Sequence, residues 1–200
     1  MLFGITALVF VGLSWTLTGI VMSEAPKKGL RPAMVLLLSG IISTPISPTI
    51  LLFTGIGDCS LRGFFIASVI YFMATGINFM MLQLMSYAMQ RGPNGVIWSI
   101  IQSALIFPFL IGILFFGSKF SLSRGIGVVL LLIALGFLAA SKNNTTQRKN
   151  WKLPTFVAFV SAGLVITLKT IPSYYPDMQQ INSVARAFVS HLGAMSTALI

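Results

Sequence analysis

Acidic residues are the scarcest feature of this 200-residue chain, which has three of them, Glu24, Asp58 and Asp177, beside thirteen Lys and Arg. It also has a single cysteine, Cys59, and a single histidine, His191. One cysteine excludes an internal disulfide, and the absence of a Cys/His cluster leaves no ligand set for zinc. The same shortage of histidine and aspartate argues against a Ser-His-Asp triad. We therefore expect no metal, no cofactor and no enzymatic activity.

Charge of either sign is also sparse, at 8% of the residues, against 56% hydrophobic residues and a mean hydropathy of +0.94. Soluble domains have about a quarter charged residues, so this composition predicts an all-α, multi-pass membrane protein with the lipid bilayer as a partner. The net charge of +10 lies mostly in short segments between apolar runs. There Lys and Arg orient helices and meet headgroups, so we expect no binding to nucleic acid.

Seven apolar runs are candidates for helices that cross the ~30 Å of a hydrocarbon core. The first has no charged segment before it, which favours a spanning helix over a cleaved signal. Pro45 and Pro48 in the second run and Pro108 in the fourth each remove a backbone donor, which predicts helix bends. The runs cover residues 2–22, 33–55, 63–90, 96–117, 125–140, 153–171 and about 181–200.

Polar and aromatic side chains inside these runs are the candidate substrate ligands, because such groups face the protein interior or a cavity. For any single residue, a hydrogen bond between helices is an equally good explanation. Lys169 has a further alternative: its ammonium, three residues before Pro172, could extend to the headgroups. The candidates are Trp15, Thr18, Tyr71, Asn78, Gln83, Trp98, Gln102 and Lys169.

A short internal repeat indicates how the helices are organised. Gly12–Ile20 and Gly163–Ile171 agree at five of nine positions, and the shift of about 150 residues contains five helices. An odd number of helices places the two copies upside down relative to each other, with a site between them near mid-depth. We therefore expect a five-helix repeat at 1–141, a polar linker at 142–152, and the incomplete start of a second repeat at 153–200.

The fourth and fifth runs carry a further pattern: a proline, an apolar stretch, a short polar break and a helix that begins with glycine. In this respect the chain resembles the drug/metabolite transporter superfamily, specifically its EamA-type ten-helix members. The resemblance implies a chain of about 300 residues, of which this sequence has the first repeat and part of the second. The residues that carry it are Pro108, the stretch Phe-Phe-Gly-Ser-Lys-Phe-Ser-Leu from Phe115 to Leu122, Gly125, Gly127 and Gly136.

The resemblance implies a secondary transporter in the plasma membrane (the inner membrane in bacteria) that moves a sugar, an amino acid or an organic anion by alternating access. One departure is clear, because Ser118 and Lys119 stand where the family usually has an acidic residue. The first helix also lacks the glutamate with which small multidrug relatives exchange drugs for protons. A cavity without carboxylates favours a neutral polar or anionic metabolite over a cationic drug.

Two alternatives stay open at this stage. The polar groups could serve only to hold helices together, which would make the chain a non-transporting membrane scaffold or accessory subunit. Either protein could have a second copy of the chain as a partner, in a homodimer. The orientation is also open, because the excess of Lys and Arg in the first, third and fifth loops places the amino terminus outside. The family resemblance implies the opposite orientation.

Overall fold

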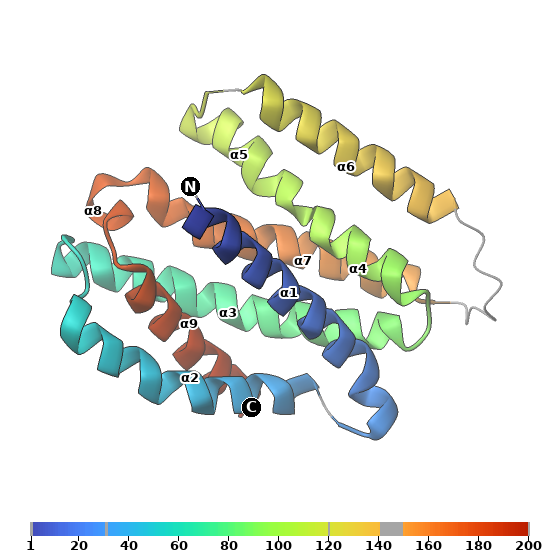
Figure 1. Cartoon of the computed structure of the whole chain (residues 1–200), viewed down its shortest axis with the longest axis horizontal. Helices are drawn as coiled ribbons and strands as arrows, with labels where there is room; N and C mark the ends of the chain where they lie inside the picture. The colour runs from blue at the N-terminus through green and yellow to red at the C-terminus, as the bar shows by residue number, and fades with distance from the viewer. Residues whose placement is uncertain (1, 31, 120, 141–149, 200) are drawn as a thin grey trace.

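A computed structural model describes residues 2–30, 32–119, 121–140 and 150–199 (Figure 1). Within that part of the chain every named element is an α-helix or a short 3₁₀-helix, so the prediction of an all-α fold is confirmed. Each of the seven apolar runs contains a helix. The elements are α1 (Leu2–Glu24), η1 (Pro26–Lys28), α2 (Pro32–Thr54), α3 (Leu61–Met89), α4 (Asn94–Gln102), η2 (Ser103–Leu105), α5 (Ile106–Phe116), α6 (Leu122–Ala140), α7 (Lys152–Thr170), η3 (Ile171–Tyr174), α8 (Pro176–Gln179) and α9 (Ser183–Ala198).

Four helical stretches in the described part are long and apolar enough to cross a membrane: 37–54, 61–89, 94–116 and 152–174. The stretch from 94 to 116 consists of α4, η2 and α5, so one predicted helix is divided in two. Pro108 has no N–H to donate to the carbonyl of Ala104, four residues earlier. The helix leaves regular α geometry at Ser103–Leu105, beside that carbonyl. By contrast, α2 is a continuous helix with Pro45 and Pro48 inside it.

Helix α3 lies at the centre of the arrangement and packs most extensively against α7 and α9, while α2 covers the other side of α9 (Figure 1). Helices α4 and α5 pack on α7, and α1 crosses α3 near its end, where Ser86 Oγ donates to the Met22 carbonyl at 3.3 Å. The chain therefore places side by side segments that are far apart in the sequence: Met22 and Ser86 are 64 residues apart, and Thr44 of α2 and Met195 of α9 are 151 apart. The directions of the ribbons show that α7 runs opposite to α1, and α9 opposite to α2 (Figure 1).

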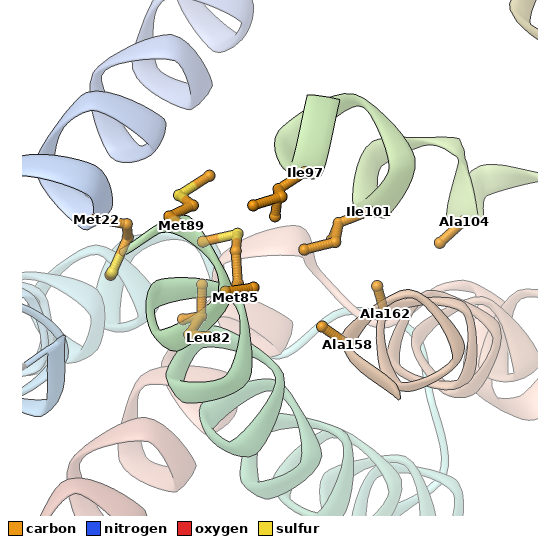
Figure 2. Packing of buried hydrophobic residues seen from close by; sticks show 10 residues of the cluster. Met22, Leu82, Met85, Met89, Ile97, Ile101, Ala104, Ala158 and Ala162 are labelled. Atoms are coloured by element: carbon orange, nitrogen blue, oxygen red, sulfur yellow. The ribbon is translucent and has the colours of Figure 1, made fainter. Parts of the chain in front are cut away.

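The main core joins α1, α3, α4, η2 and α7 (Figure 2). Two alanines on α7, Ala158 and Ala162, are buried against isoleucine and methionine side chains and let the helix backbones approach closely. In a bilayer such packing stabilises association through dispersion contacts, since lipid is as apolar as the helices. The buried members are Met22, Leu82, Met85, Ala88, Met89, Ile97, Ile101, Ala104, Ala158 and Ala162.

Two loops far apart in the sequence are joined at one end of the molecule. Gly57 and Ile181 form an isolated antiparallel bridge, and the Asn182 backbone N–H donates to the Ile56 carbonyl at 2.9 Å. The Asn182 side-chain amide also donates to the Gly55 carbonyl at 3.3 Å. We call this contact, between residues 55–57 and 180–182, the loop junction. It connects the α2–α3 turn to the start of α9.

Candidate functional site

Two side-chain amides on the inner helices are half-buried and unpaired. Asn78 lies in the middle of α3, one helical turn before the buried Leu82, and Gln102 is the last residue of α4, beside the buried Ile101. Neither amide forms a hydrogen bond within the described part of the chain. A polar group without a partner is costly in hydrocarbon, so amides in this state are available to water or to a polar ligand.

Trp98 of α4 closes the space between α4 and α1. Its indole lies against Gly19, where a Cβ atom would come within 3.3 Å of the ring. The side chain lines a crevice of about 340 Å³ with Thr16, Gly19, Ile20, Ser23, Met89, Asn94 and Gly95. The crevice therefore has an aromatic wall, two hydroxyls and the Asn94 amide, a combination that suits a small ligand with a polar and an apolar part.

The two candidates on α1 have different places. Thr18 is exposed, and its hydroxyl donates to the Ser14 carbonyl at 2.9 Å, so it does not line this crevice. Thr16 lines it instead. The side chain of Trp15 lies outside the described residues. Because Thr16 and Thr18 lie in the same repeated segment, the sequence alone does not distinguish them.

Gln83 is separated from Asn78. Five residues along an α-helix amount to a rotation of about 140°, and Gln83 points to another side of α3. There it lines a second crevice of about 400 Å³ with Leu84, Ser86, Tyr87, Gln90 and Pro154. Asn78 of α3 and Gln102 of α4 therefore do not line the crevice that Gln83 lines. That crevice lies between α3 and the start of α7.

Tyr71 and Lys169 lie together between α3 and α7. The Tyr71 side chain is 5% exposed, and its hydroxyl donates to the Lys169 backbone carbonyl at 3.3 Å. The Arg186 guanidinium, from α9, interacts electrostatically with Tyr71, and the His191 imidazole with Lys169. We call Lys169, Arg186 and His191 the basic cluster. Its two α9 members were not among the predicted site residues, although a histidine and an arginine inside an apolar run were the available signal.

Acidic groups and metal ligands do not meet in this region. The part of the chain that the structure describes has no group of three or more His, Cys, Asp and Glu side chains able to hold a metal. Glu24 pairs with Lys27 at 2.6 Å on the surface, and Asp58, between α2 and α3, and Asp177, in α8, are exposed. The helices that carry the candidate residues therefore offer amides, hydroxyls, indoles and cations.

Comparison with known proteins gives one match. The model of the EamA-like transporter family matches residues 2–140, a range that extends from α1 to the end of α6. No curated protein and no solved structure matches the chain. The matched range includes Asn78, Trp98 and Gln102, whereas the basic cluster follows it.

Proposed function

Because the chain belongs to the EamA-like transporter family, we propose that it is a secondary transporter that carries a small polar metabolite across the plasma membrane by alternating access. The family consists of membrane transporters of the drug/metabolite type and is not an enzyme family. The observation that carries the proposal is the pair of half-buried, unpaired amides of Asn78 and Gln102 on the inner helices. A scaffold that only packs helices together has no need for them.

The arrangement of the helices supports alternating access. Helices α1 and α7, which carry the two copies of the repeated segment, run in opposite directions, as do α2 and α9 (Figure 1). This is the relation expected of inverted repeats, which leave a binding site between them and expose it alternately by rocking one repeat against the other. The interruption of α4–α5 at Ser103–Leu105 follows directly after Gln102. Broken helices are typical of substrate sites in such transporters.

Each proposed ligand has a distinct role. The Asn78 and Gln102 amides both donate and accept hydrogen bonds, so they can hold hydroxyl, carbonyl or carboxyl groups. Trp98 supplies a flat apolar wall, on which the apolar face of a sugar or an amino-acid side chain can rest. Tyr71 and Lys169 add a hydroxyl and a cation further along α3 and α7. These groups fit a sugar, an amino acid or an organic anion.

Replacing Gln102 by alanine is expected to reduce uptake at low substrate concentration to about a tenth or less, since losing a hydrogen bond to a buried ligand costs about 1–3 kcal/mol. The measurement is uptake into liposomes that contain the purified protein. Gln180→Ala is the matched control, because Gln180 is exposed and lines neither crevice. Uptake that is equal in both variants would remove Gln102 from the site.

Identification of the substrate class comes first. Thermal unfolding of the detergent-purified protein is measured with sugars, amino acids, nucleosides and organic anions. A ligand that binds only the folded state adds RT ln(1 + [L]/Kd), or about 2.7 kcal/mol at a concentration of 100 Kd. We expect a saturable rise in the unfolding midpoint with one chemical class. A folded protein that responds to none of them would favour the scaffold function.

A further inference from the structure

Lys169 lies on the face of α7 that carries the buried small and apolar side chains. Ala158, Ala162 and Val165 are 0%, 4% and 4% exposed, and Lys169 continues their spacing of three and four residues along the helix. Side chains at such intervals share one face. The stem of Lys169 therefore starts from the same face as the buried alanines, and the side chain is half-buried.

The Lys169 ammonium has no anionic partner within the described part of the chain. It forms neither an ion pair nor a hydrogen bond there. The charged group that does interact with it is another potential cation, His191. A half-buried cation without a counter-ion is costly in a membrane-spanning helix. Such residues are retained in membranes chiefly for function.

Arg186 has a fixed position near Tyr71, whose hydroxyl contacts the Lys169 backbone. Its guanidinium donates to the carbonyls of Ile181 at 3.0 Å and Gln179 at 2.7 Å, which hold it over the end of α8. These bonds leave its positive charge uncompensated, because carbonyl groups are neutral. Arg186 thus adds a positive field near Tyr71.

Neutral donors complete the region. The Tyr71 hydroxyl lies at the Lys169 backbone, and Ser68, three residues earlier on the same side of α3, has a buried hydroxyl without a hydrogen-bond partner. An unsatisfied buried hydroxyl is unusual in a folded protein. Cations together with hydroxyl donors are the groups that proteins use to hold carboxylate and phosphate.

We propose that the basic cluster binds the carboxylate or phosphate group of the transported metabolite, so that the substrate is an anion. The inference rests on the proposed transport function and specifies its substrate class. The bound anion supplies the counter-charge that Lys169 lacks, while the amides of Asn78 and Gln102 bind the uncharged part of the molecule. An anionic lipid headgroup has the same chemistry, and the experiment separates it from a soluble anion.

The test compares the full chain with Lys169→Gln, which removes the charge, and Lys169→Arg, which keeps it. Lys152→Gln is the matched control, since Lys152 is exposed at the opposite end of α7. Thermal unfolding is followed in neutral detergent with acetate, pyruvate, succinate, citrate, glutamate, inorganic phosphate and glycerol 3-phosphate, at constant ionic strength set with chloride. Phosphatidylglycerol forms a separate arm, with phosphatidylcholine as its reference.

We expect at least one soluble anion to raise the unfolding midpoint of the wild-type chain, Lys169→Arg and Lys152→Gln. In Lys169→Gln, the anion concentration that gives half of the maximal rise in the unfolding midpoint should increase about 10-fold or more, because a hydrogen bond to a charged group is lost. If Lys169→Gln is not folded, the measurements on the wild-type chain test the proposal. A saturable rise in the unfolding midpoint with an anion, and no rise with its neutral amide or alcohol analogue, supports it.

Three results would overturn it. A response to phosphatidylglycerol without one to any soluble anion would assign the cluster to lipid. An anion response that Lys169→Gln leaves unchanged would place the anion elsewhere. Saturable stabilisation by a neutral metabolite alone would contradict an anionic substrate and leave the transport function intact. The transport function itself fails if the protein is folded and no small molecule either stabilises it or crosses the membrane through it.

Discussion

Replacing Gly57 by alanine is expected to destabilise the protein by about 3 kcal/mol, because the loop junction has no space for a side chain. A Cβ atom at this position would come within 2.2 Å of the Gln180 carbonyl oxygen and 2.8 Å of the Asn182 backbone nitrogen. Both are backbone atoms, so neither can rotate away. The φ angle of +97° adds a conformational cost of about 1 kcal/mol. The measurement is the free energy of unfolding in detergent.

Gly55→Ala separates the two causes. Gly55 also has a positive φ, +67°, but a Cβ atom there would meet nothing within 4 Å. The control should therefore lose only the conformational part, about 1 kcal/mol. Equal losses in the two variants would show that backbone strain, and not the contact between the two loops, determines the effect.

The second large effect is expected at Gly163, where alanine should cost about 2–3 kcal/mol. Its Cβ atom would come within 2.4 Å of Phe107 Cδ2 and 2.5 Å of Cγ. The Phe107 ring is held by an edge-to-face contact with Phe159, with centroids 5.2 Å apart. The methyl group therefore forces α5 away from α7, and overpacking of this kind typically costs 1–3 kcal/mol. Thermal and denaturant unfolding in detergent both report it.

Gly12→Ala is the matched control, since Gly12 is the equivalent glycine in the first copy of the repeated segment. A Cβ atom at Gly12 would meet nothing within 4 Å. Alanine is a better helix former than glycine by up to ~1 kcal/mol, so this variant should be as stable as the wild type or slightly more stable. A similar loss at both positions would contradict the role of the Phe107 contact.

The fold was largely predictable from the sequence because the bilayer imposes strong constraints on it. A spanning segment needs a long apolar run with internal backbone hydrogen bonding, and all seven runs contain helices. The residues around Pro108 and Gly117 also allowed the family to be predicted, and the match over 2–140 confirms it. The position of the interruption at Ser103–Leu105 follows from the geometry of proline, which affects the turn before it.

The site was less predictable, because helical spacing shows which residues share a face but not which helix covers it. Arg186 and His191 interact with Tyr71 and Lys169 only because α9 packs between α2 and α3, a placement that no local pattern specifies. The separation of Gln83 from Asn78 was in principle available from the helical period. Placing both among the candidate ligands of one substrate disregarded a rotation of about 140°.

The contact between α2 and α9 differs in kind from the others, since it pairs a helix with its own counterpart in the proposed repeat. Near the carboxyl end of α9, Met195 lies against Gly40 of α2, and the Thr44 hydroxyl lies 3.0 Å from the Met195 sulfur. A two-fold axis that relates the proposed repeats would pass through this pair of helices and would make their contact isologous. In the proposed arrangement, α2 and α9 therefore face each other within one polypeptide as two identical subunits do across the interface of a symmetric dimer.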